Sequence, residues 1–67
     1  MKYEVNTIVA TLVKKDKAPK GSVGAILGLK EDEQNGEVLY LVELFTVTSV
    51  EHLQLFYTKD EIYAIQQ

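Results

Sequence analysis

The sequence predicts a small all-β domain, and three observations support that class. Apolar runs are rich in β-branched residues, as in the segment from Val5 to Val13, and such residues favour extended backbone. Short segments with glycine, proline or asparagine separate these runs, as turns separate strands. No window of useful length has apolar residues at helical spacing. A chain of 67 residues is long enough for one domain, placed at 1–67, and too short for two.

The first half of the chain contains two predicted strands joined by a polar loop. The first strand covers 5–13, and the loop covers 14–20, which holds the only proline. The second strand covers 21–29 and contains three glycines. Glycines inside a strand predict tight curvature or a close approach of two backbones, as at the corner of a barrel.

The second half predicts three more strands and one helical turn. Asn35-Gly36 favours the positive φ angles of a hairpin tip. Thr58 and Glu61 have the spacing of a capping box, so we expect one short helical turn there, followed by a short last strand. The predicted ranges are 31–36 for the hairpin tip, 38–47 for the third strand, 47–51 for a turn and 52–57 for the fourth strand.

This order of elements predicts an all-β, small five-stranded SH3-like barrel with one short helical turn before the last strand. The alternative is a partly open Greek-key barrel of the oligonucleotide-binding type. Such barrels are longer and place a helix between the third and fourth strands, where this chain has only a turn. The SH3-like arrangement is therefore preferred.

The composition restricts the classes of function. Ten acidic residues against seven lysines give a net charge of −3, and arginine is absent. Arginine is the side chain that most often binds phosphate and guanine, and a net positive charge supplies most non-specific affinity for nucleic acid. This chain has neither, so nucleic acid is not an expected partner. The chain has no cysteine, which excludes disulfides and thiol chemistry, and we expect no cofactor. No apolar run approaches the length of about 20 residues that a membrane helix needs, and 5–13 lacks the features of a signal peptide. The expected location is the bacterial cytoplasm.

Four short motifs resemble a known family. They are Asn6-x-Ile8-Val9, Lys20-Gly21-x-x-Gly24-x-Ile26, Tyr40-x-Val42-Glu43-Leu44 and Asp60-Glu61-Ile62. Their order is similar to that of the bacterial SH3-like family named domain of unknown function 4926, and the likeness extends from Glu4 to Ile65. The Gly-x-x-Gly-x-apolar element also resembles the KOW motif of ribosomal and transcription-factor barrels. The resemblance implies a fold and no catalytic residues. Proteins of this kind are similar in size to immunity proteins and antitoxins.

The third strand contains the candidate interface. Seven of the eight residues 38–45 are apolar, whereas a strand with one buried face needs only alternate apolar residues. If Val38, Tyr40, Val42 and Leu44 face the core, three apolar side chains face outward. Exposed apolar patches of this kind mark protein interfaces, unless the last strand or the long loop covers them. The candidate interface residues are Leu39, Leu41 and Phe45.

The charged side chains cluster at two predicted loops. Four of the seven lysines lie in the first loop, and the acidic run 31–37 lies at the hairpin tip, so the charge is bipolar. The acidic run lacks the alternating spacing of a calcium loop. His52, the only histidine, has no partner that would make it a catalytic base, and no metal site is expected. The candidate charged contacts in the loop are Lys14, Lys15, Lys17 and Lys20.

These observations predict a protein that is not an enzyme but a protein-binding module, for example an immunity protein or antitoxin that covers a toxin. Its partner would be another protein or a second copy of the chain, as in a homodimer. The alternative is a KOW-like accessory protein that binds RNA or the ribosome.

Overall fold

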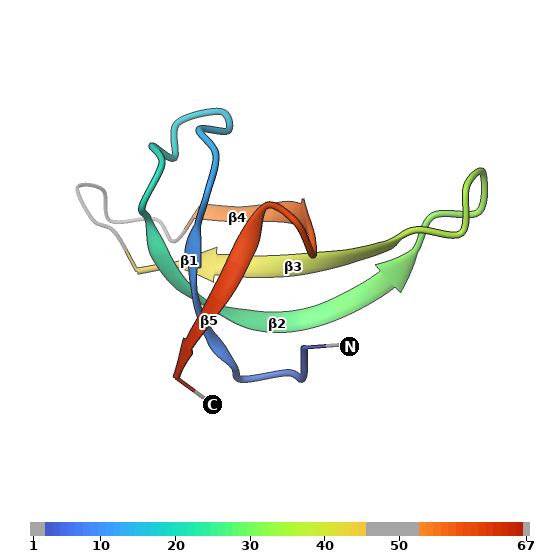
Figure 1. Ribbon diagram of the computed structural model, residues 1–67, viewed down its shortest axis with the longest axis horizontal. Coiled ribbons are helices and arrows are strands. Elements are labelled where there is room, and N and C mark those ends of the chain that lie inside the picture. The colour runs from blue at the N-terminus through green and yellow to red at the C-terminus, as the bar shows by residue number, and fades with distance from the viewer. Residues whose placement is uncertain (1–2, 46–52, 67) are drawn as a thin grey trace.

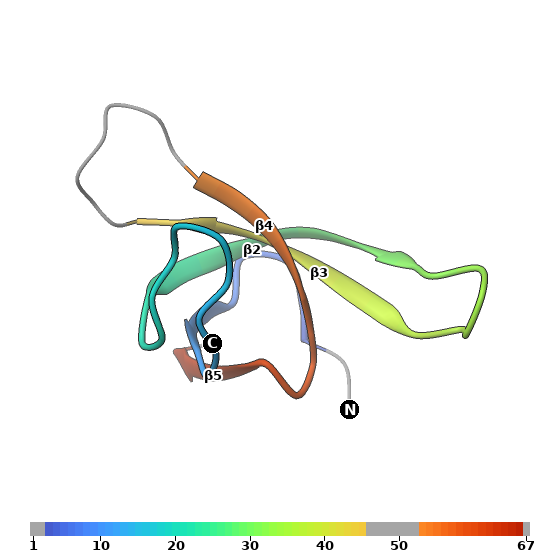
Figure 2. The same ribbon diagram turned by 90° about the horizontal axis from the view of Figure 1, so that it is seen from above.

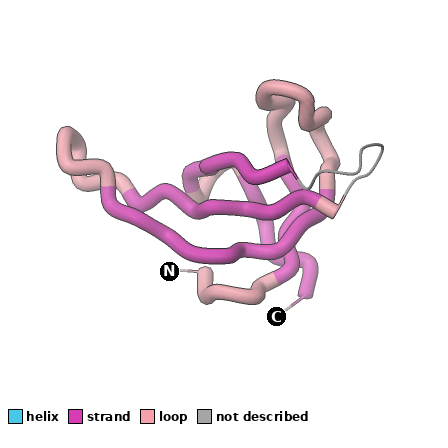
Figure 3. Tube along the Cα trace, turned by 180° about the vertical axis from the view of Figure 1, so that it is seen from behind, coloured by secondary structure: helices cyan, strands magenta, loops and turns pink. Residues whose placement is uncertain are grey.

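The computed structural model describes residues 3–45 and 53–66, and all regular structure in them is β-strand (Figures 1 and 3). Five strands follow one another along the chain. They are β1 (Ile8–Thr11), β2 (Val23–Glu31), β3 (Val38–Leu44), β4 (Leu53–Thr58) and β5 (Ile62–Gln66). The predicted all-β class is thus confirmed.

The five strands form one antiparallel sheet in the order β4-β3-β2-β1-β5. The last strand pairs with the first, so β1 lies between β2 and β5. β2 is shared by two parts of the sheet: its first residues pair with β1, and Gly24 to Glu31 pair with β3. The sheet bends along β2, and β1 and β5 cross steeply against β3 and β4 (Figures 1 and 2). The pairing leaves β4 and β5 as its two edges.

The core lies inside the bend, and alternate residues of each strand point into it. In β3, Tyr40, Val42 and Leu44 are at most 1% exposed, which confirms the predicted alternation. Val38 is half-buried and packs against this core. The buried cluster consists of Val9, Ala18, Ile26, Tyr40, Val42, Leu44, Tyr57 and Ile62.

Gly24 is the glycine whose missing side chain the bend requires. A Cβ there would collide with the carbonyl oxygen of Glu43 and lie 2.9 Å from the Cα of Leu44. The backbones of β2 and β3 therefore meet closely at this point, as the sequence predicts. Farther along β2, the register with β3 shifts between Ile26 and Gly28, which is a bulge that bends and twists the strand.

The helical turn predicted at 58–61 is wrong. Thr58 is the last residue of β4, and only a single turn separates it from β5. The N–H of Glu61 donates to the carbonyl oxygen of Thr58 at 3.0 Å, and the N–H of Thr58 donates to Oε1 of Glu61 at 2.9 Å. The capping-box residues thus satisfy each other across one turn. No helix follows, because Ile62 already pairs with Thr11 of β1.

Several strand boundaries also differ from the predictions. The first strand begins at Ile8 and not at Val5, because Asn6 has a positive φ of 77° in a turn closed by a bond from Thr7 N–H to the carbonyl of Glu4. Near the hairpin tip, positive φ occurs at Gly36 and not at Asn35. The third strand ends at Leu44. The turn predicted at 47–51 lies outside the described residues.

Candidate interaction surfaces

The three predicted interface residues do not form one surface. Leu39 and Leu41 are half-buried on the outer face of β3, whereas Phe45 follows the end of the strand and is 53% exposed. Glu43 lies between them on the same face, and its carboxylate accepts a hydrogen bond from the side chain of Gln54 at 3.4 Å. This polar pair divides the outer face of β3 into two parts.

Leu39 and Leu41 belong to a surface that also includes β4. Leu41 lies directly opposite Phe56, whose side chain is 39% exposed, and opposite pairs in an antiparallel sheet share a face. On the other side, Lys30 of β2 lies opposite Leu39. Its Nζ is 4.4 Å from the centre of the Phe56 ring, a cation–π contact that reaches across β3. We call Leu39, Leu41 and Phe56 the β3–β4 patch.

Phe56 is a member of this patch that the sequence reasoning missed. The alternation of β4 carries the signal, because Leu53, Leu55 and Tyr57 pack inward, so the intervening Phe56 must face outward. The strand was predicted over 52–57, but the two faces of that strand were not assigned. The contact of Phe56 with Lys30 across β3 is not evident from any local sequence pattern.

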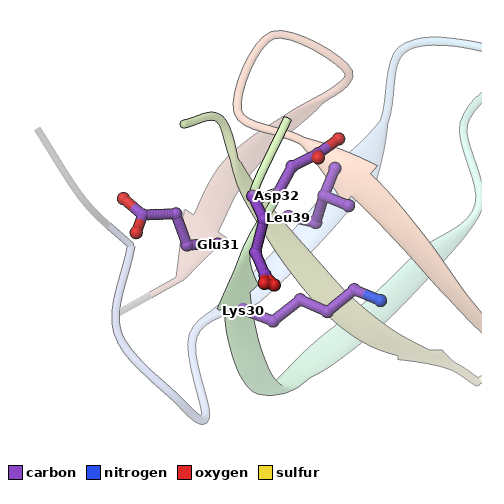
Figure 4. A pocket seen from close by; sticks show the side chains of 5 residues that line it. Lys30, Glu31, Asp32 and Leu39 are labelled. Atoms are coloured by element: carbon purple, nitrogen blue, oxygen red, sulfur yellow. The ribbon is translucent and has the colours of Figure 1, made fainter. Parts of the chain in front are cut away.

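The acidic hairpin borders the β3–β4 patch. Residues 32–37 form a compact turn in which Asp32 N–H donates to the carbonyl of Glu37 at 2.7 Å, and the side chain of Asp32 accepts from Gln34 N–H at 2.9 Å. An open pocket of about 420 Å³ is lined by Lys30, Glu31, Asp32, Glu33 and Leu39. In Figure 4, Lys30 and Leu39 lie beside one another, and Glu31 points the other way. Carboxylates thus lie next to the apolar side chain of Leu39.

The four loop lysines have different roles. Lys14, Lys17 and Lys20 are exposed. Lys15 turns back toward the sheet: its Nζ lies 2.9 Å from the carbonyl oxygen of Phe56, 3.0 Å from Oε1 of Glu61 and 4.8 Å from the centre of the Tyr57 ring. Lys15 therefore joins the loop to β4 and to the turn before β5, and it is not part of a free basic surface.

The loop that carries these lysines folds over the core and not over the β3–β4 patch. Ala18 is 1% exposed and belongs to the buried cluster. At the base of the loop, Thr11 Oγ1 accepts hydrogen bonds from the N–H groups of Gly21 and Ser22 at 3.1 and 3.0 Å. The loop and the acidic hairpin lie far apart in both views (Figures 1 and 2), so opposite charges occupy separate ends of the molecule.

The pKa values of Glu61 and Tyr57, which both lie near Lys15, are shifted. Burial would raise the pKa of Glu61, but hydrogen bonds from Thr58 and the ammonium group of Lys15 outweigh burial and lower that pKa. The pKa of Tyr57 is raised by burial and by the negative charge of Glu61. The Tyr57 hydroxyl is buried and has no hydrogen-bond partner.

The remaining candidates from the sequence are a histidine, a metal site and a membrane helix. His52 lies outside the described residues. Within 3–45 and 53–66, no group of three or more His, Cys, Asp or Glu side chains could hold a metal ion. The same residues contain no helix long and apolar enough to cross a membrane. Comparisons of the chain with protein-family models, with curated proteins and with solved structures found no match.

Proposed function

We propose that the chain is a non-enzymatic protein-binding module that docks a basic partner protein through the β3–β4 patch and the acidic hairpin. The observation that carries this proposal is the position of Phe56. Its ring is 39% exposed, lies opposite Leu41, and shares the outer face with Leu39 beside the acidic pocket. An exposed aromatic among apolar neighbours with a charged rim is the usual composition of a protein-binding surface.

The charge of the hairpin supports a basic partner. Glu31, Asp32, Glu33 and Glu37 lie near one lysine, Lys30. Such a concentration of like charge attracts an oppositely charged protein over a distance and speeds association. A cationic bacterial toxin, such as a nuclease that its immunity protein or antitoxin must cover, has the required charge. A cytoplasmic location, where such a toxin would have to be neutralised, is part of this proposal.

The SH3-like barrel is the fold proposed for this module. Support comes from a first strand that pairs with both the second and the last strand, from the long loop after β1 and from the short turn before β5. Membership of the family named domain of unknown function 4926 is likewise a proposal and rests on the four sequence motifs.

The test begins with a pull-down from the native host, followed by mass spectrometry and a binding titration with the purified partner. Phe56→Ser should weaken binding by about tenfold or more, as loss of a central aromatic residue does. Tyr63→Ser is the matched control, because Tyr63 is also exposed, at 46%, but lies on β5. Raising the salt concentration should slow association.

Two results would contradict the proposal. One is equal weakening by Phe56→Ser and Tyr63→Ser when both variants remain folded. The other is recovery of RNA or ribosomal proteins through the lysine loop, which would favour the KOW-like alternative.

A further inference from the structure

A second apolar surface lies on the outer side of β1 and β5, apart from the surface proposed for the basic partner. Four large apolar side chains on it are 41–53% exposed. They come from the residue after β1, from β5 and from the residue after β3. They are Leu12, Phe45, Tyr63 and Ile65, and we call their surface the β1–β5 face.

The strand register brings these side chains together. Ala10 lies opposite Val23 on one side and opposite Tyr63 on the other. Phe45 continues the same row, because its N–H donates to the carbonyl oxygen of Val23 at 2.8 Å. The row thus crosses four neighbouring segments of the sheet. Ala10, in the middle of this row, is only 4% exposed.

The row from Phe45 through Ala10 to Tyr63 on the β1–β5 face carries no charge, and opposite charges border its two ends. Exposed Lys14 and Lys17 follow β1 at one end. At the other end, exposed Glu4 precedes β1. Glu43, which is opposite Ala25, also lies toward the Glu4 end. The outward positions are Ile8, Ala10, Leu12, Val23, Ala25, Phe45, Tyr63 and Ile65.

We propose that the β1–β5 face binds the same face of a second copy of this chain about a two-fold axis. An apolar row is complementary to itself, as an isologous contact requires. If β1 of one copy runs antiparallel to β1 of its partner, the lysine end of each copy meets the carboxylate end of the other. The parallel arrangement would bring the lysine ends together, and like charges would oppose it.

The size of the face predicts a weak dimer. Four large side chains, each about half exposed, offer on the order of 400 Å² of apolar surface per copy, about half of what one partner contributes to a standard stable interface. We therefore expect a dimer that dissociates on dilution in the micromolar range or above. The chain could bind its basic partner through the β3–β4 patch as a monomer or as a dimer, because the two surfaces share no residue.

Sedimentation equilibrium of the purified chain from about 10 μM to 1 mM tests the proposal. The wild type should pass from monomer to dimer over this range. Phe45→Ser and Tyr63→Ser should each weaken the dimer by about tenfold or more, whereas Phe56→Ser should leave the dimerisation constant unchanged. Thermal melts must show that each variant is folded.

The absence of cysteine in the chain allows a second test that does not depend on removing a side chain. Tyr63→Cys should form an intermolecular disulfide under mild oxidation, and Phe56→Cys should do so much more slowly. The charge-reversed Lys17→Glu should weaken the dimer, and mixing it with Glu4→Lys should restore association. A wild type that stays monomeric at 1 mM, or a dimer that Phe56→Ser dissociates and Tyr63→Ser does not, would overturn the proposal. A wild type that stays monomeric would leave the test of the basic partner unaffected.

Discussion

Lys15 and Glu61 form an ion pair between the loop after β1 and the turn before β5, with 3.0 Å between Nζ and Oε1. The two residues are 46 positions apart in the chain. The same ammonium group donates to the carbonyl of Phe56 at the edge of β4. One lysine side chain thus links the loop, the β4 edge and the turn.

Replacing Lys15 by alanine should destabilise the fold modestly. The side chains of Lys15 and Glu61 are 36% and 27% exposed, so solvent screens the pair, and we expect a loss of about 1 kcal/mol from the ion pair and the bond to Phe56 together. Urea unfolding measures the change. Lys17→Ala, in the same loop but at an exposed position, is the control and should leave the free energy of unfolding unchanged. Equal effects of the two substitutions would show that the ion pair contributes nothing.

Stability should fall in acid partly because of Glu61. Its pKa is lowered in the folded chain, so its contribution is complete above the ordinary pKa of glutamate and is lost as the pH falls through the lower folded value. Urea melts between pH 7 and pH 3 should therefore show a smaller acid loss for Glu61→Gln than for the wild type. Parallel curves for the two proteins would contradict the assignment.

Two buried tyrosines should respond oppositely to loss of the hydroxyl group. The Tyr57 hydroxyl has no partner, so Tyr57→Phe should leave stability unchanged or raise it by up to about 1 kcal/mol. The Tyr40 hydroxyl accepts a hydrogen bond from Tyr3 N–H at 3.1 Å, so Tyr40→Phe should cost about 1 kcal/mol. Thermal or urea melts of the two variants make the comparison. A clear loss in Tyr57→Phe would mean that its hydroxyl is satisfied in solution.

Alanine substitutions at two glycines of β2 should differ in their effect on stability. Gly24→Ala places a methyl group against the backbone of Glu43 and Leu44, so β2 and β3 must move apart, and we expect a loss of about 2 kcal/mol or more. At Gly28 a Cβ meets nothing within 4 Å, and Gly28→Ala should be tolerated. Circular dichroism melts report both. Similar melting temperatures for the two variants would show that the bend does not need Gly24.

Leu41→Lys should leave the fold intact and abolish binding of the basic partner. Leu41 lies on the outer face opposite Phe56 and Gly28, so a lysine there has room but adds positive charge to the proposed contact. A thermal melt beside the partner titration distinguishes the outcomes. If the variant unfolds, Leu41 contributes to stability and not to recognition. If both properties are unchanged, the β3–β4 patch is not the binding surface.

Patterns within one strand were predictable from the sequence, and relationships between strands were not. The alternation in 38–45 correctly placed Tyr40, Val42 and Leu44 inside. The pairing of Leu41 with Phe56 depends on the register of β3 with β4, which no single strand encodes. The capping-box spacing at 58–61 was real, but the pairing of Ile62 with β1 decided its conformation. The sequence did not distinguish Lys15 from the neighbouring loop lysines, because its contact with Glu61 joins distant parts of the chain.

The pairing of β5 with β1 has a consequence for synthesis. Residues 8–11 leave the ribosome well before their partners at 62–66. A sheet that depends on such distant contacts folds slowly, and until they form, one edge of β1 has no partner. The chain must therefore complete its fold after translation of residue 66, and the uncovered edge of β1 is the site at which a nascent chain would aggregate or engage a chaperone.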